Sequence, residues 1–158
     1  MTYITDDIRQ MLQVERDVRL SPPISDSDIR KWAIAVYWPE TPPRQFWDAD
    51  YATTTRWGGI IAPEEFNPFA WPIARQEDVR LGGLIGTEPG QRILNGGSEA
   101  RYYAPMRPGD VIRSATTLTE VYEKTGRLGM MLFLINAVSW SNQHGIVVKV
   151  DRRTNIRY

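Results

Sequence analysis

The 158-residue sequence contains no cysteine and a single histidine, His144. The lack of cysteine excludes disulfides, a thiolate nucleophile and cysteine-based zinc or iron–sulfur sites. A lone histidine also argues against a metal centre, because no second histidine exists to join it. Net charge is absent as well, since nineteen basic residues balance nineteen acidic ones. No overall field therefore favours nucleic acid or an anionic membrane as a partner.

Long apolar runs are missing too. No run approaches the roughly 18 residues that cross a bilayer, and the start, MTYITDDIRQ, lacks the basic and apolar regions of a signal peptide. The sequence thus predicts a cytoplasmic protein. The glycine-rich stretch between Arg75 and Gly97 contains no G-K-[ST], so it predicts a long loop and not a phosphate-binding loop. The length fits a single domain over residues 1–158.

Helical patterns dominate the first half of the chain. Apolar residues at helical spacing after Thr5 predict an N-terminal helical extension within residues 1–15. RDVRLSPP then predicts a short strand. In SDSDIRKWAIAVY, Ser25 and Asp28 have the spacing of a capping box, which predicts a helix that Pro39 and the prolines after it end.

Two further helices are predicted before the glycine-rich stretch. One begins at Asp48 and ends at Gly58. The other begins at Pro63, is strongly apolar and contains Phe66.

Strand patterns fill the second half. The segments SEARYYAP, DVIRSATTLTEVY, GMMLFLINAVSW and GIVVKVDRRTNIRY are rich in β-branched and aromatic residues, and the turns MRPGD, KTGR and NQHG separate them. The third segment is apolar on both faces, which predicts that something covers it twice. The last alternates polar residues with Val148, Val150 and Ile156, which predicts one wet face and one dry face. Together the halves predict an α+β fold, one antiparallel sheet around the apolar helix near Phe66.

Three of these stretches resemble the MaoC-like dehydratases and enoyl-CoA hydratases, in particular their N-terminal half-domain, the FAS1-like dehydratase type. They are SDSDIRKWAIAVYWPETPPRQFWDADYA with GGIIAP, NGGSEARYYAPMRPGDVI, and the final EKTGRLGMMLFLINAVSW through NIRY. The Pro-Gly-Asp at 108–110 is the most specific piece. The resemblance implies a hot-dog fold, a curved five-stranded antiparallel sheet wrapped around a central helix. It also implies hydration or dehydration of an acyl thioester, no separate cofactor because the substrate carries coenzyme A, and domains that work in pairs.

The family's catalytic segment is similar to G-D-x-N-P-x-H-x-D-x-x-Y-A, in which an Asp and a His hold one water. Aligned on DADYA without a gap, the family Asp falls on Thr41 and the His on Phe46. Aligned on Pro43, they fall on Glu40 and Gln45. Neither alignment supplies a histidine. The resemblance therefore implies that this chain has lost the catalytic Asp–His pair. Glu40 is retained as a candidate general base, against the simpler interpretation of a solvated loop residue.

The chain has six tryptophans, and as a group its aromatic side chains suggest an apolar cavity or a subunit interface. The candidate substrate-binding residues are Trp38, Phe46, Trp57, Phe66, Phe69 and Trp71, each with core packing as the alternative. Arg44, Arg56, Arg75 and Arg80 are candidates for coenzyme A phosphates, against ordinary solvation.

Three functions remain open. The first is a non-catalytic half of a 2-enoyl-CoA hydratase acting on a fatty, mycolic or steroid side chain. It would shape the acyl pocket beside a second hot-dog subunit that carries the Asp and His, as a heterodimer or dimer of heterodimers, with a homodimer as the alternative. The second is a self-sufficient hydratase that uses Glu40. The third is a non-catalytic acyl-CoA binding or scaffold module.

Overall fold

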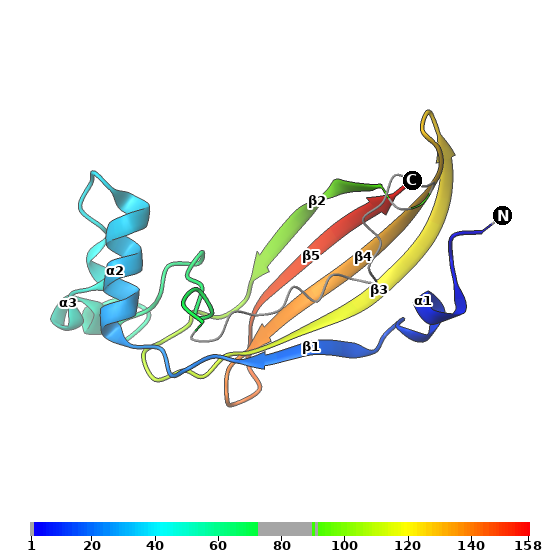
Figure 1. The fold of residues 1–158 in the computed structure, drawn as a ribbon. Helices are drawn as coiled ribbons and strands as arrows, with labels where there is room; N and C mark the ends of the chain where they lie inside the picture. Colours follow the sequence, from blue (N-terminus) through cyan, green and yellow to red (C-terminus); the bar gives the residue numbers. More distant parts are fainter. Residues whose placement is uncertain (1, 73–89, 91) are drawn as a thin grey trace.

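One five-stranded antiparallel sheet organises the computed structural model, which describes residues 2–72, 90 and 92–158 (Figure 1). Its strand order is β1-β3-β4-β5-β2. The strands are β1 (Glu15–Leu20), β2 (Ile93–Tyr102), β3 (Arg113–Gly126), β4 (Gly129–Ser141) and β5 (Val147–Arg157). The helices are α1 (Asp6–Gln10), α2 (Asp26–Tyr37), the 3-10 turn η1 (Arg44–Phe46) and α3 (Ala49–Thr54). The α+β architecture predicted from the sequence is confirmed.

The three turns predicted in the second half all join strands. KTGR closes the β3–β4 hairpin, where Gly129 has a φ of +87°, a conformation that glycine adopts without strain. β2 starts earlier than predicted: the sequence predicts a loop as far as Gly97, whereas the strand begins at Ile93. Ile93 pairs with Arg157, and the register shifts between Asn95 and Ser98, where the glycines fall. A bulge tolerates those glycines within a strand. Residues 73–89 and 91 of this part of the chain, including Arg75 and Arg80, lie outside the described residues.

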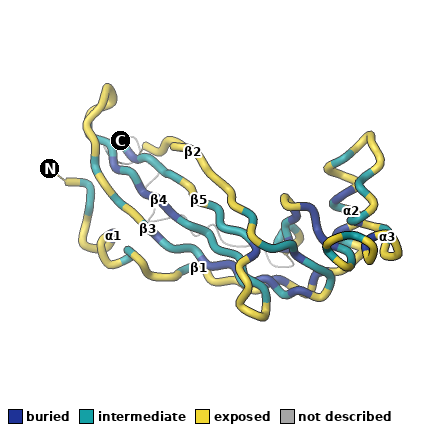
Figure 2. Tube along the Cα trace, turned by 180° about the vertical axis from the view of Figure 1, so that it is seen from behind, coloured by how far each residue is buried: buried dark blue, intermediate teal, exposed yellow. Residues whose placement is uncertain are grey.

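The two faces of the sheet differ in what covers them. We call inner the face that carries Leu132, Leu134 and Trp140, because Ile8 of α1 packs on the two leucines and Phe69 packs on Trp140. The opposite, outer face has none of the described helices over it (Figures 1 and 2). The prediction that β4 is covered on both sides is therefore met on only one side within residues 2–72 and 92–158.

The predicted alternation of polar and apolar residues along β5 is present. The polar residues, however, lie on the inner face of the sheet. Lys149 pairs with Trp140 and Arg157 with Leu132, so the polar series points to the same side as the α1 contacts. Arg157 is only 7% exposed. Val150 and Ile156 lie on the outer face, and Val148, at the start of the strand, is buried in the main core.

All three predicted helix caps are present. The side chains of Thr5, Ser25 and Asp48 accept hydrogen bonds from the backbone N–H groups of Ile8, Asp28 and Tyr51. Each thereby satisfies an N–H group that has no partner within its own helix.

The prediction of an apolar helix that begins at Pro63 is wrong for the part of that segment that the structure describes. Residues 63–72 form turns. Pro68 and Pro72 explain this, because each lacks a donor and disfavours helix in the residue before it. α2 and α3 lie beyond one end of the sheet instead of within its curve (Figure 1). The central position expected for a helix is not filled by any helix among the described residues.

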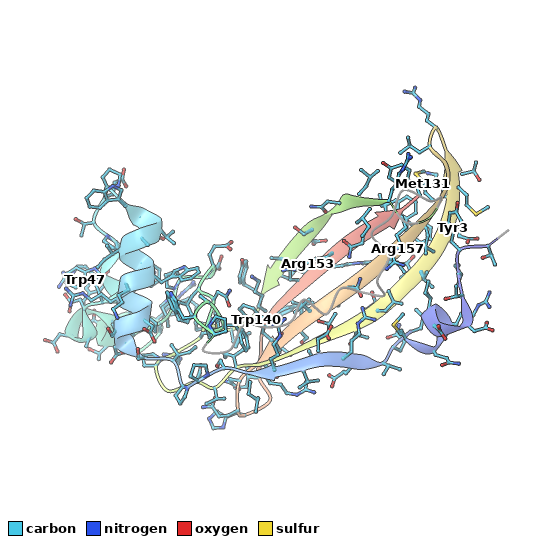
Figure 3. All side chains as sticks on the ribbon, in the orientation of Figure 1. Tyr3, Trp47, Met131, Trp140, Arg153 and Arg157 are labelled. Atoms are coloured by element: carbon cyan, nitrogen blue, oxygen red, sulfur yellow. The ribbon has the colours of Figure 1, made fainter. Side chains whose placement is uncertain are left out.

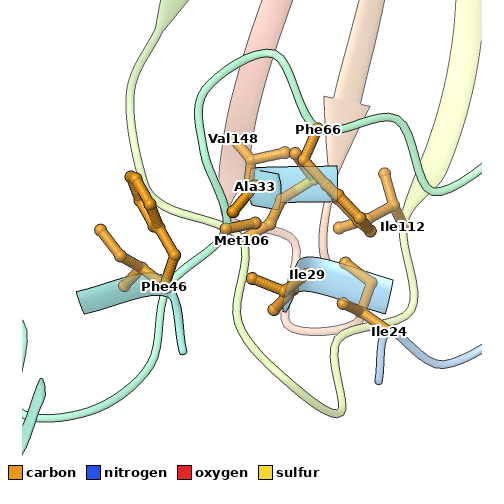
Figure 4. Packing of buried hydrophobic residues seen from close by; sticks show 10 residues of the cluster. Ile24, Ile29, Ala33, Phe46, Phe66, Met106, Ile112 and Val148 are labelled. Atoms are coloured by element: carbon orange, nitrogen blue, oxygen red, sulfur yellow. The ribbon is translucent and has the colours of Figure 1, made fainter. Parts of the chain in front are cut away.

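The main core joins the α2 end of the molecule to the nearby ends of the strands (Figure 4). Its buried members come from α2 and the residues just before it, from η1, from the 61–66 segment, from the β2–β3 loop and from the start of β5. They are Ile24, Ile29, Ala33, Phe46, Ile61, Ala62, Phe66, Met106, Ile112 and Val148. Phe66 is 1% exposed and meets Trp32 edge to face, with ring centroids 5.6 Å apart. Phe66 therefore occupies the core, although its helix does not form.

The Pro-Gly-Asp motif acts as a joint in this core. The Gly109 N–H donates to the Ile24 carbonyl at 2.8 Å, and the Ile24 N–H donates to the Asp110 carbonyl at 2.9 Å. The Asp110 carboxylate accepts from the Arg107 N–H at 2.8 Å. Gly109 has a φ of +86°, which favours glycine. The motif thus fixes the loop before β3 to the segment that leads into α2.

Candidate functional site

The segment after α2 is the one that the resemblance aligns with the family's catalytic motif. Glu40 is exposed at the end of the helix, where its N–H donates to the Tyr37 carbonyl at 2.8 Å. Its side chain lines none of the cavities described below. Phe46 instead points inward, 6% exposed, with its ring 6.0 Å from that of Tyr37. The segment therefore buries an aromatic ring and presents its carboxylate to solvent.

Asp48 is committed to local structure. Its carboxylate accepts the Tyr51 N–H at 3.0 Å and pairs with the Arg44 guanidinium at 2.7 Å. The Tyr51 N–H, followed by Arg44, lowers the pKa of Asp48. Arg44 also lies over the Tyr51 ring, at 4.5 Å from its centroid. This carboxylate is a helix cap, as its place in the sequence predicts, and Arg44 is its partner.

The six aromatic candidates do not form one cluster. Trp38 and Trp71 are 78% and 62% exposed. Phe46 and Phe66 are core residues, and Trp71 reaches Trp32 at the edge of that core, with ring centroids 6.2 Å apart. Trp57 and Phe69 pack against the same core and line separate cavities. Phe66 and Trp71 both line a further cavity of about 460 Å³ beside Pro22, Ile24 and Lys31.

The first cavity, the Trp57 cavity, has a volume of about 220 Å³. The 57–64 segment forms one wall, and the end of β2 with the start of β5 forms the other. Its lining includes Trp57, Ile61, Ala62, Pro63, Tyr102, Met106 and Lys149. On the surface beside it, the Arg56 guanidinium lies 4.2 Å from the Trp57 ring centroid. The lining is therefore mainly apolar and aromatic, with charged groups of both signs, Lys149 and Glu64, among it.

Tyr102 and Lys149 carry the polar contacts of this cavity. The Tyr102 hydroxyl donates to Glu65 at 2.8 Å. The Lys149 ammonium lies 5.3 Å from the Tyr102 ring centroid and 5.0 Å from that of Trp140, positions typical of cation–π contacts. Burial, together with the bond to Glu65, raises the pKa of Tyr102 to about 12. The hydroxyl thus stays protonated at neutral pH and acts as a donor, not as a base.

Sequence reasoning missed Tyr102, Lys149 and Glu65 as a group. The signals were weak, because a Tyr-Tyr pair before the MRPGD turn and a lysine in an alternating strand are common features. Their meeting depends on register: Tyr102 pairs with Lys149 and Lys149 with Trp140, which places three side chains in one row across β2, β5 and β4. Only the strand order reveals this row.

No acid–base pair of the family type comes together in the described structure. His144 is exposed in the β4–β5 turn, where its N–H donates to the Asn142 side chain at 3.0 Å. It lines neither the Trp57 cavity nor the segment after α2. No group of three or more potential metal ligands gathers among the described side chains. None of the helices in residues 2–72 or 92–158 has the length and hydropathy to cross a bilayer.

The model of the FAS1-like dehydratase domain region matches residues 16–150. The chain belongs to this family. Its fold is similar to that of the MaoC-like dehydratase from Rhodospirillum rubrum, with 20% identity, 90% of each chain covered and a TM-score of 0.58. These findings confirm the resemblance seen in the sequence and the hot-dog fold that it implies. No curated protein sequence matches the chain significantly.

Two further structures with this fold are assemblies from Mycobacterium tuberculosis. The ChsH1–ChsH2 complex shares 17% identity, over 91% of this chain and 84% of that one, with a TM-score of 0.64. The C-terminally truncated HadBC (3R-hydroxyacyl-ACP dehydratase) complex shares 15% identity, over 88% and 95%, with a TM-score of 0.55. At these identities the likeness establishes the fold of this chain.

Proposed function

We propose that this chain is the non-catalytic half of a 2-enoyl-CoA hydratase or dehydratase, paired with a second hot-dog subunit that carries the catalytic Asp and His. One observation carries the proposal: the segment in the family's catalytic position has no such pair. There Phe46 is buried, Asp48 caps α3 and Glu40 is exposed. Proton transfer by a positioned pair is what hydration of a double bond requires.

The sheet offers a place for the second subunit. β2 is an edge strand, and all of its residues except Tyr102 are exposed. Within the described residues nothing pairs with its outer edge. A long unpaired edge presents a row of N–H and C=O groups that another strand can bond. The two Mycobacterium structures above are named as complexes, which supports a hot-dog partner.

The contribution of this chain is acyl binding. The Trp57 cavity lies next to the C-terminal end of β2, so a subunit added at that edge adjoins it. Its walls are suited to an apolar thioester chain, and the Arg56 guanidinium beside it is available to a phosphate. Tyr102 and Lys149 supply the polar contacts that orient a ligand.

The test compares the chain alone with the chain bound to its co-purifying subunit. Hydration of 2-enoyl-CoA substrates, from short linear to ring-bearing, is followed for both preparations. We expect turnover by the pair and none by the chain alone. Efficient hydration by a homodimer would refute the proposal that this chain is catalytically silent. Loss of that activity in Glu40→Gln, with Asp26→Asn, at an exposed carboxylate outside the cavity, as control, would assign the base to Glu40. Binding without turnover in every pairing would instead identify a scaffold module.

A further inference from the structure

The loop after α3 lies beside two guanidinium groups that have no carboxylate partner. The Arg56 guanidinium lies 4.2 Å from the centroid of the Trp57 ring. The Arg107 guanidinium lies against Gly59, where its Nη1 atom is 3.9 Å from the position that a Cβ atom would take. Seven other arginines of the described structure, Arg153 among them (Figure 3), pair with a carboxylate. Arg56 and Arg107 do not within that part of the chain, so each keeps a fork of N–H donors for an external anion.

The same loop has two backbone N–H groups without an acceptor. The Ala62 N–H donates to the Met106 carbonyl at 2.8 Å, which holds the loop beside the residue that precedes Arg107. Among the described residues, the N–H groups of Gly59 and Ile60 meet no acceptor, and both residues are half-buried. Guanidinium groups and free backbone N–H groups are the donors with which proteins bind phosphate. Both kinds of donor therefore meet at Gly59.

The carboxylates of the neighbouring segments do not neutralise these guanidinium groups directly. The Asp110 carboxylate accepts from the backbone N–H of Arg107, and its hydrogen bonds do not include the Arg107 guanidinium. Glu65 accepts from the Tyr102 hydroxyl at 2.8 Å. Glu64 is exposed and lines the Trp57 cavity without an ion pair to either arginine. The position beside Gly59 is therefore open to an anion from outside the chain.

The number of donors favours a phosphate over a carboxylate. A phosphate monoester carries a charge of about −1.5 to −2 and three acceptor oxygens, whereas a carboxylate carries one charge and two oxygens. We propose that Arg56, Arg107 and the N–H groups of Gly59 and Ile60 form a phosphate-binding site, which we call the Gly59 site. Its phosphate comes either from the nucleotide of coenzyme A or from the phosphopantetheine arm of a carrier protein. The inference goes beyond the acyl-CoA function proposed above, because binding of phosphate here does not depend on that function.

Calorimetric titration at low ionic strength tests the Gly59 site, because salt screens exposed charges. The protein is the chain together with any subunit that co-purifies with it. The probes are adenosine 3′,5′-bisphosphate and 4′-phosphopantetheine, each compared with its unphosphorylated counterpart, adenosine or pantetheine. We expect at least one phosphorylated probe to bind about ten- to hundredfold more tightly than its counterpart, the range of one hydrogen bond to a charged group. The probe with the larger gain identifies the source of the phosphate, and no gain for either probe refutes the site, whatever the hydration assay shows.

Two kinds of variant locate the effect. Arg56→Gln and Arg107→Gln should each weaken the phosphorylated probe about tenfold or more, whereas Arg127→Gln, exposed in the β3–β4 turn, is the matched control and should bind it like the wild type. Binding of the phosphorylated probe at wild-type strength by both of the first two variants would overturn the site.

Gly59 provides a second pair of variants that leaves both arginines in place. A side chain fits there, because only the Arg107 Nη1 atom lies within 4 Å of the Cβ position and the backbone is not left-handed. Gly59→Asp places a carboxylate beside Arg107 and should weaken the phosphorylated probe at least about tenfold. Gly59→Asn has the same size without the charge and should weaken it by at most about threefold. Equal loss in the two variants would show that charge does not decide binding and would contradict a phosphate site.

Discussion

Replacement of Asp110 by alanine should destabilise the whole domain, although Asp110 lies outside the cavities described above. Asp110 is 8% exposed, and its carboxylate accepts from the Arg107 N–H at 2.8 Å and from the Gln143 side chain at 3.4 Å. Loss of the first bond leaves a backbone donor without its acceptor, which costs about 1–3 kcal/mol. The second bond is long and adds less. We therefore expect Asp110→Ala to lower the free energy of unfolding by about 2 kcal/mol.

Urea denaturation measures this loss. The midpoint should fall with an unchanged slope, because the variant alters stability and not the surface exposed on unfolding. In a domain of this size the thermal midpoint should fall by about 4–8 °C. Asp110→Asn retains an oxygen that can accept from Arg107 and should lose about half as much. Asp26→Asn, exposed in the first turn of α2, is the control and should change stability by at most about 0.5 kcal/mol.

A stability of Asp110→Ala within about 0.5 kcal/mol of the wild type would refute the view that the motif is a joint. The same view would be refuted if Asp110→Ala folded normally and lost only acyl-CoA turnover in the assembled pair. In that case the motif would serve the chemistry and not the architecture.

Two other changes follow from single contacts. The pKa of Tyr102 is raised to about 12 in the folded state, so the unfolded chain releases this proton first and the free energy of unfolding should fall as pH rises from about 10 toward 12. Tyr102→Phe should lack that decline in alkaline denaturation curves. An identical decline in both proteins would contradict the raised pKa of Tyr102. Ser25→Ala removes the oxygen that accepts from the Asp28 N–H and should lower the free energy of unfolding by about 1 kcal/mol in urea denaturation. Ser25→Thr keeps a hydroxyl and should lose less stability. An equal loss in both variants would indicate an effect other than capping.

The features that could be predicted from the sequence are those decided by local interactions. Caps at Thr5, Ser25 and Asp48 depend on a side chain and an N–H group two or three residues later, so their spacing is visible in the chain. Strand periods and turn residues are similarly local. The failure at Pro63 is local as well: a proline is favourable at a first helical position, but Pro68 and Pro72 follow too closely for a helix to extend.

The features that could not be predicted depend on which strands are neighbours. Alternation in β5 separates two faces but does not say which one is covered, and the polar face proved to be the inner one. The row of Tyr102, Lys149 and Trp140 likewise exists only because β5 lies between β2 and β4. The aromatic candidates were chosen by residue type, and the structure distributes them among the core, the surface and three cavities because type alone does not determine position.

Pro-Gly-Asp, the motif most specific to the family, indicates the architecture of the chain and not its activity. Pro-Gly-Asp holds a loop against the segment entering α2 through backbone hydrogen bonds, a task that remains whether or not the chain catalyses a reaction. The segment from Glu40 to Asp48 does not depend on a catalytic pair for its structure. The buried Phe46 and the helix cap at Asp48 hold it in place. The fold and the edge strand therefore do not depend on a catalytic Asp–His pair in this segment. This independence is why the proposed function is that of a pair, in which a second subunit carries the catalytic residues.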